Sequence, residues 1–282
     1  MFNTVKFPYT LLGQPCLLLA PHYLKSAARD EKEKDKKDED KEKMERLSFS
    51  VSANPSKEKM TAKQFELEAR TRHENDALFV YWMVLPEFKS AKCNYGEVDF
   101  GNLGSPSSEG KSFAFRDIPY LLKYDEETVP HVRCWITAIN AVPKSAGGKV
   151  HVKARVESGP SPSTGFRLLV EGLEGTHVEA LKIGWIAHTP PEKTNADFVS
   201  GESRVELVGE QVKVKKELAA ALSDKPLNTF VGINEVRADL THLLSYSVTF
   251  LPETCKDAVH LNVCSLGLGK VEVLGLSWIL SM

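Results

Sequence analysis

The chain has few cysteines, and they show no paired arrangement. Its 282 residues include five, with no Cys-x-x-Cys spacing among them. An odd number without such spacing fits neither a complete disulfide framework nor a cysteine-based zinc site. We therefore expect mostly buried thiols, no metal and no other cofactor. Cys134 and Cys264 lie in apolar strand patterns, where free cysteine acts as a small hydrophobic side chain.

Long apolar runs and a dominant charge are also absent. No apolar stretch approaches the about 20 residues that span a bilayer as a helix. The apolar start at residues 11–20 is interrupted by Gly13, Gln14 and Pro15, which does not fit a secretory signal. The 36 basic and 38 acidic residues give no whole-molecule field that would attract nucleic acid. The sequence predicts a cytoplasmic protein, with unconventional secretion as the alternative, that has no membrane span and no nucleic-acid partner.

Motifs typical of catalysis are missing as well. The sequence has no GxSxG elbow, no HExxH helix, no P-loop and no glycine-rich dinucleotide turn. We therefore expect a protein that is not an enzyme and that acts by binding.

What the chain does contain is one order of landmarks, repeated three times. Each copy has a proline before an apolar strand, then alternating strands separated by polar turns, and a closing strand with Trp82, Trp185 or Trp278. The predicted strands cover residues 5–9, 15–19, 47–51, 65–69 and 78–84, then 95–101, 130–136, 150–156, 165–170 and 181–187, and finally 230–233, 246–250, 258–263 and 273–280.

These strands indicate an all-β chain of tandem antiparallel β-sandwiches. Alternation puts Val150, Val152, Ala154 and Val156 on one face of a strand and His151 on the other, as a half-buried strand requires. Short alternating strands between turn signals are typical of sandwiches. Polar or Pro-containing linkers divide the chain into residues 1–89, 94–190 and 197–282, called here the first, second and third segments.

Three further features carry expectations of their own. The three closing tryptophans are expected in the core, whereas Trp135 lies opposite the apolar face of its strand and fits a seam between segments. Residues 215–222 contain good helix formers and predict a short helix. Residues 29–46 are charged except at Met44, so they interrupt the first segment either as a solvated helix or without regular structure. This insertion is expected to be a surface loop or a docking site for a charged partner.

The repeated landmarks resemble the H-type, snail agglutinin-like lectin domain. The second segment carries the resemblance best: residues 95–101 are similar to the family's first strand, and residues 164–166 and 184–187 to its later landmarks. Members of that family are six-stranded antiparallel β-sandwiches that assemble as trimers and bind galactose or N-acetylgalactosamine between protomers. Three copies in one chain therefore imply a single-chain pseudo-trimer, monomeric in solution. The first copy starts without the family's opening strand, so we expect a neighbouring segment to fill that edge or the chain to be part of a longer one.

The resemblance also implies where a sugar would bind. The family's central-strand arginine and the polar pair before its last strand correspond, in the second segment, to His151 and to the Leu173-Glu174 turn. In the first segment the equivalent loop is residues 70–76, and the loop at residues 104–109 is its expected neighbour across an interface. The candidate carbohydrate-binding residues are Arg70, Arg72, His73, Ser107, Glu109, His151 and Glu174.

The implied function is carbohydrate binding in glycan recognition or adhesion, with terminal galactose or N-acetylgalactosamine as the ligand class. A sugar site needs directional polar groups on a preformed surface. The third segment carries Ser245, Leu266 and Gly267 at the corresponding positions. The alternative is therefore a structural or protein-interaction module on a lectin scaffold whose sugar sites have decayed.

Overall fold

The structure is a computed structural model, and every regular element in the part of the chain that it describes is a β-strand. No helix long and apolar enough to cross a membrane occurs in that part. The described residues are 2–6, 16–25, 46–53, 64–71, 76–85, 93–144, 148–158, 163–190, 198–207, 210–218, 228–240, 245–251, 258–265 and 270–281.

Each of the three segments contributes five or six strands. The first segment contributes β1 (Phe2–Lys6), β2 (Cys16–Lys25), β3 (Leu47–Ala53), β4 (Gln64–Thr71) and β5 (Ala77–Leu85). The second contributes β6 (Cys93–Asp99), β7 (Ser112–Pro119), β8 (His131–Val142), β9 (Lys149–Ser158), β10 (Gly165–Leu173) and β11 (His177–His188). The third contributes β12 (Phe198–Glu206), β13 (Gln211–Glu217), β14 (Asn228–Asp239), β15 (Ser245–Phe250), β16 (Ala258–Ser265) and β17 (Lys270–Ser281).

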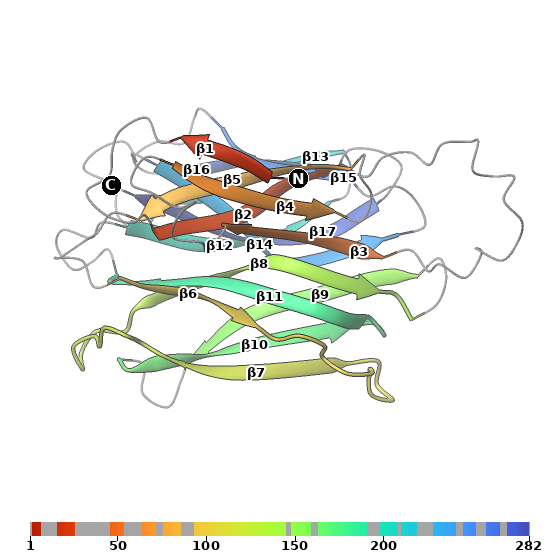
Figure 1. Cartoon of the computed structure of the whole chain (residues 1–282), viewed down its shortest axis with the longest axis horizontal. Coiled ribbons are helices and arrows are strands. Elements are labelled where there is room, and N and C mark those ends of the chain that lie inside the picture. Colours follow the sequence, from red (N-terminus) through yellow and green to blue (C-terminus); the bar gives the residue numbers. More distant parts are fainter. Residues whose placement is uncertain are drawn as a thin grey trace, which may run out of the picture.

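These strands form three antiparallel sheets (Figure 1), and each sheet takes strands from two segments. The first sheet has the order β1-β4-β3-β8-β11-β6, the second β12-β17-β14-β9-β10-β7, and the third β13-β16-β15-β2-β5. The second segment thus places β6-β11-β8 in one sheet and β7-β10-β9 in another. The third segment repeats this with β12-β17-β14 and β13-β16-β15, and the first with β2-β5 and β1-β4-β3.

Three seams join the segments, one in each sheet. β8 of the second segment pairs with β3 of the first, β14 of the third with β9 of the second, and β2 of the first with β15 of the third. In each pair one partner, β8, β14 or β2, is the strand that follows the proline of its segment. The three segments are therefore connected by continuous backbone hydrogen bonding, because a sheet does not stop at a segment boundary.

Side-chain burial follows the predicted alternation. Val150, Val152 and Ala154 are almost fully buried, and Val156 is partly buried against the same core. Trp185 and Trp278 are core residues as expected, whereas Trp82 is only partly buried. Two of the three closing tryptophans thus lie in the core, and the first differs.

The five cysteines divide in a similar way. Cys93, Cys134 and Cys264 are free thiols, but Cys134 is fully buried while Cys93 and Cys264 are partly exposed. Burial raises the pKa of the Cys134 thiol, so this side chain is a packing element rather than a reactive group. The side chains of Cys16 and Cys255 lie outside the described residues.

Trp135 occupies the junction of all three segments. Its indole is 1% exposed and packs in a cluster with residues of every segment, including Met83, Ile186 and Ile279. Its Nε1–H donates a 2.7 Å hydrogen bond to the carbonyl oxygen of Leu19. The sequence-based expectation that Trp135 lies at a seam is therefore confirmed.

The predicted helix at residues 215–222 is wrong where it can be checked. Residues 215–217 belong to β13, which pairs with β16 so that Val212 faces Val263 and Val214 faces Leu261. Val212 and Val214 pack against the core. Burial of this alternating face outweighs the small helix propensity of the following residues. Residues 219–222 lie outside the described residues, as does the insertion at 29–45.

Three strands were not expected from the sequence, namely β7, β12 and β13. Their apolar content is low, and they obtain their pairing from stronger neighbours. β7 pairs with β10 over eight residue pairs, and β12 pairs with β17 over nine.

Replacing Trp135 tests whether the junction holds the segments together. Trp135→Ala is expected to lower the free energy of unfolding by about 3–5 kcal/mol, because it removes a buried aromatic side chain. Trp135→Phe keeps an aromatic ring but leaves the Leu19 carbonyl without its donor, at a cost of about 1–3 kcal/mol. Urea denaturation followed by far-UV circular dichroism measures both. Leu121→Ala, at a side chain that is 89% exposed, is the control and should change stability by less than about 0.5 kcal/mol.

Candidate functional site

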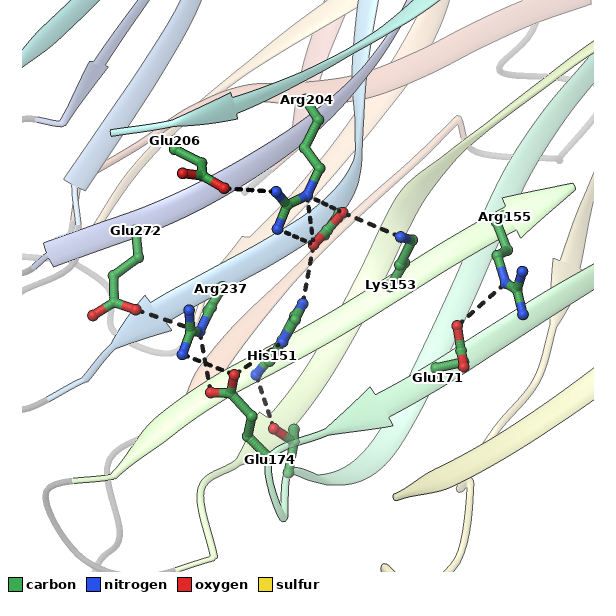
Figure 2. Close-up of polar contacts among 11 residues, drawn as sticks. His151, Lys153, Arg155, Glu171, Glu174, Arg204, Glu206, Arg237 and Glu272 are labelled. Atoms are coloured by element: carbon green, nitrogen blue, oxygen red, sulfur yellow. Dashed lines mark hydrogen bonds and ion pairs between the residues drawn. The ribbon is translucent and has the colours of Figure 1, made fainter. Parts of the chain in front are cut away.

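The polar faces of β9 and β14 meet at the seam between the second and third segments. In the register of this pair Arg237 lies opposite His151 and Glu235 lies opposite Lys153. The other face of the same pair is apolar, with Val236 opposite Val152. Side chains from β12, β17 and the β10–β11 turn complete the group (Figure 2). We call it the seam cluster; its members are Lys149, His151, Lys153, Glu174, Arg204, Glu235, Arg237 and Glu272.

Glu174 reaches the cluster from a tight turn. Leu173 accepts a 2.9 Å hydrogen bond from the Thr176 amide, and between them Glu174 and Gly175 both have positive φ, 55° and 77°. This is the geometry of a type I′ hairpin turn, which non-glycine residues rarely adopt at its first central position. The strain places the Glu174 carboxylate beside β9 and β14, and such outliers are typical of functional positions.

His151 lies between two carboxylates. Its Nε2 is 3.1 Å from Oε1 of Glu235 and its Nδ1 is 3.5 Å from Oε1 of Glu174. The Nε2 contact is a hydrogen bond, whereas Nδ1 has no hydrogen-bond partner in the described part of the chain. The backbone is fixed as well, since the His151 amide donates to Oγ1 of Thr176 at 2.8 Å.

Glu235 forms the buried base of the cluster, with a side chain that is 5% exposed. Burial opposes its ionisation, but hydrogen bonds from His151 and Arg204 and the nearby charge of Lys153 outweigh burial and lower its pKa to about 2. The Arg204 Nε lies 3.2 Å from Oε2 of Glu235. Glu235 is thus a fixed negative charge that orients His151.

Glu174 and Arg237 form the outer, solvent-accessible layer. Arg237 holds Glu174 through two contacts, Nη2 to Oε1 at 2.8 Å and Nε to Oε2 at 3.1 Å. About one third of each of these side chains is exposed, compared with 11% for His151. Glu272 adds a second carboxylate beside Arg237, since its Oε2 lies 3.3 Å from the Arg237 Nε. Its Oε1 lies 2.5 Å from Nζ of Lys149, which brings Lys149 into the cluster. The exposed pair therefore lies next to the buried His151–Glu235 pair, through the Glu174 carboxylate.

The loop with Ser107 and Glu109 lies next to the same turn. The Gly175 amide donates to the carbonyl oxygen of Gly110 at 2.8 Å. Ser107 is used locally, since its carbonyl and hydroxyl accept hydrogen bonds from Gly110 and Lys111. Glu109 is exposed. The structure thus brings this loop to the Glu174 turn, although neither predicted side chain enters the seam cluster.

The candidate residues of the first segment lie elsewhere. Arg70 is an exposed residue of β4 that pairs with Glu68 of the same strand. In the first sheet β3, β8 and β11 separate β4 from β6, which leads into the 104–109 loop. Arg70 is therefore not brought beside that loop as the sequence suggested. Arg72 and His73 lie outside the described residues.

The sequence reading missed the partners that the third segment supplies, namely Arg204, Glu235, Arg237 and Glu272. Glu235 and Arg237 interrupt a strand that is otherwise mostly buried, and charges in such a strand are costly unless paired. The two charges within an apolar stretch can be seen in the sequence, but the sequence does not show that β9 is the strand beside them.

A second buried polar group lies between β11 and β12. His188 donates from Nδ1 to the Thr189 carbonyl at 2.9 Å and its Nε2 accepts from Ser200 at 2.7 Å. Burial lowers the pKa of His188 to about 3, against a weaker effect of the Thr189 hydrogen bond. An imidazole with such a low pKa is a weak base at neutral pH. This contact fixes the start of β12 against β11.

Metal ligation and known relatives give no further lead. No group of three or more His, Cys, Asp or Glu side chains in the described ranges is arranged to hold a metal ion. Comparison of the chain with family models, curated proteins and solved structures finds no match. Function must be inferred from the geometry and the sequence pattern.

The ionisation of Glu235 gives a testable pH dependence. Its pKa is lowered from 4.5 to about 2 on folding, so its stabilising contribution is complete above about pH 4.5 and is lost as the pH falls toward 2. Glu235→Gln should flatten the stability profile over this window by up to roughly 3 kcal/mol. Urea denaturation at several pH values measures it. Glu126→Gln, in an exposed loop, is the control and should lose stability between about pH 4.5 and 2 as the wild type does. If Glu235→Gln lost as much stability over this window, Glu235 would not be the group responsible.

Proposed function

We propose that the protein binds carbohydrate at the seam between the second and third segments, without performing a reaction. The observation that carries the proposal is the layered arrangement of the seam cluster. Glu174 and Arg237 are paired with each other at the surface, and Glu174 lies 3.5 Å from His151 of the buried His151–Glu235 pair. A binding site needs exposed polar groups on a rigid support, because ordering the groups at the moment of binding would cost affinity.

The chemistry of these groups suits sugar hydroxyls. A carboxylate accepts hydrogen bonds through two oxygens, and a guanidinium offers five N–H donors, so each can bind a hydroxyl while remaining paired with the other. Charge-assisted hydrogen bonds of this kind are stronger than neutral ones. The resemblance to H-type lectins points to galactose or N-acetylgalactosamine as the ligand, in recognition or adhesion.

We further propose that the chain is a single-chain pseudo-trimer of H-type lectin-like sandwiches. The cyclic sharing of strands supports this reading, since each segment joins the next through the same pair of strand positions in all three sheets. Covalent linkage raises the effective concentration of the three units, so no association between chains is needed to form a seam.

Sugar binding and its dependence on the outer pair test the proposal. Binding of N-acetylgalactosamine and galactose is measured by protein-observed NMR titration at up to millimolar sugar. Glu174→Gln and Arg237→Gln should each weaken binding by about tenfold or more, because each removes a charged hydrogen-bonding group. Arg155→Gln is the matched control: Arg155 lies on β9, as His151 does, and pairs with Glu171, away from Glu174 (Figure 2).

Two outcomes would contradict the seam site. Absence of binding at millimolar sugar would argue against a lectin function. Binding that is lost in Arg70→Ala but kept in Glu174→Gln would move the site to the first segment.

The second candidate function is protein interaction on the same scaffold. The observation that favours it is the apolar surface of β7, an edge strand of the second sheet on which Phe113 is 67% and Phe115 48% exposed. Exposed aromatic side chains on a sheet edge are typical of contact surfaces. The Arg167 guanidinium covers the Phe115 ring at 4.4 Å. Failure of sugar binding in the titration would favour this candidate.

The mass of the chain in solution tests the architecture. A pseudo-trimer completes all three seams within one polypeptide, so light scattering should give a monomer of 31.3 kDa. A particle of three times this mass would contradict the single-chain arrangement.

A further inference from the structure

The outer face of the second sheet carries a row of side chains that leads away from the seam cluster. In an antiparallel pair, residues directly opposite each other point to the same side of the sheet. Glu235 of β14 lies opposite Lys153 of β9. Lys153 lies opposite Glu171 of β10, which in turn lies opposite Phe113 of β7. One continuous face therefore connects the seam cluster with β7.

Two phenylalanines form the far end of this face. Phe113 and Phe115 lie two residues apart on β7, so both rings are on the same side of the strand, and both are exposed. Leu169 of β10 lies opposite Phe115 and is only partly buried. Contiguous exposed apolar side chains mark binding surfaces, whereas scattered ones need no explanation. We call these three residues the aromatic platform.

The two rings of the platform are held differently. The Arg167 guanidinium lies over the Phe115 ring, 4.4 Å from its centroid. Arg167 is itself held by Asp117 through hydrogen bonds of 2.7 and 2.9 Å. Phe115 is thereby fixed, and a cation occupies one of its ring faces. Phe113, which is 67% exposed compared with 48% for Phe115, is the ring that offers the larger free surface to a ligand.

Charged side chains alternate with the apolar ones on this face. Glu171 lies between Lys153 and Phe113, and its Oε2 is 3.3 Å from Nε of Arg155 (Figure 2). The core of a protein–protein interface is depleted of charged residues, so this mixture does not suit a protein partner. A sugar chain uses both kinds of side chain, because its hydroxyls bind polar groups and the C–H faces of its rings stack on aromatic ones.

The charges around the platform are balanced, which favours a ligand without net charge. Three cations and three carboxylates lie on this part of the face, as the pairing of β7, β10 and β9 shows. They are Lys153, Arg155 and Arg167, and Asp117, Glu157 and Glu171.

We propose, as an extension that rests on the sugar site at Glu174 and Arg237, that this face binds a neutral linear oligosaccharide with one galactose unit stacked on Phe113. The sheet order is β14-β9-β10-β7, and strands lie about 4.8 Å apart, so β7 is about 14 Å from β14, or roughly three pyranose units. Galactose suits the stack because its axial hydroxyl leaves one ring face with C–H groups only.

Two sugars of different length test the proposal on the full chain. The probes are galactose and β1,4-galactotetraose, titrated separately and followed by NMR. The tetrasaccharide should bind about tenfold or more tightly than galactose, because it reaches the platform as well as the seam cluster. The C–H protons of one of its units should also shift upfield, since they lie in the ring current of Phe113.

Variants of Phe113 separate the platform from the seam site. Phe113→Ala should reduce the tetrasaccharide affinity to about that of galactose and leave galactose binding unchanged. Phe113→Trp should keep the tighter binding and the upfield shift, because an indole also stacks on a sugar ring. Phe79→Ala is the matched control, since Phe79 is an exposed phenylalanine of β5 in the third sheet, and it should change neither affinity.

Failure of the platform and failure of the seam site give different results. If galactose binding depends on Glu174 but the tetrasaccharide binds no more tightly than galactose, the platform is wrong and the seam site stands. If the tetrasaccharide binds Phe113→Ala as tightly as the wild type, the platform is again wrong, and its rings are assigned to a protein partner. If neither sugar binds at millimolar concentration, both proposals are wrong.

Discussion

The indole of Trp135 is the contact on which the arrangement of the three segments depends. It packs edge-on against Phe230 with ring centroids 4.9 Å apart, and its Nε1–H is bonded to the Leu19 carbonyl. The surrounding backbone is close enough that Cβ atoms at Gly184 and Gly232 would lie 2.7 and 2.5 Å from Trp135. A large buried side chain with one polar hydrogen can thus connect three segments at once, because apolar packing and a single directional bond act at the same point.

The seams combine two kinds of interaction on opposite faces of the same strands. At the β9–β14 seam one face is apolar, with Val152 and Val236, and the other carries the charges of the seam cluster. Apolar burial fixes which face of each strand points inward, whereas the ion pairs Arg237–Glu174 and Lys153–Glu235 require one alignment of the strands. Of these charges Arg237 and Glu174 reach solvent, so the proposed binding site lies where two segments are aligned.

Much of the fold could be predicted from the sequence, because alternation is a local property. Where the structure describes them, the predicted strands coincide with observed ones to within two residues at an end, and Trp135 was expected at a seam from its face alone. The error at residues 215–217 and the omission of β12 have one cause. A weakly apolar stretch becomes a strand only through a partner distant in sequence, here β16 or β17. His151 and Glu174 of the candidate site could be predicted, because both belong to one segment. Arg237 and Glu235 could not, because they come from the next segment and join the site only through the pairing of β9 with β14.

The three seams are not equivalent, and this difference follows from the sequence each segment contributes. At the β3–β8 seam the polar contacts centre on one carboxylate. Nη1 of Arg46 and Nδ2 of Asn140 both donate to Oε2 of Glu179, at 3.0 and 2.7 Å. The β9–β14 seam holds a buried carboxylate, a buried imidazole and a strained turn residue instead. Burying ionised groups is costly unless they are fully paired, so such a group persists where its geometry is used. The proposed binding therefore belongs to the β9–β14 seam, where the buried and strained groups gather, rather than to the β3–β8 seam.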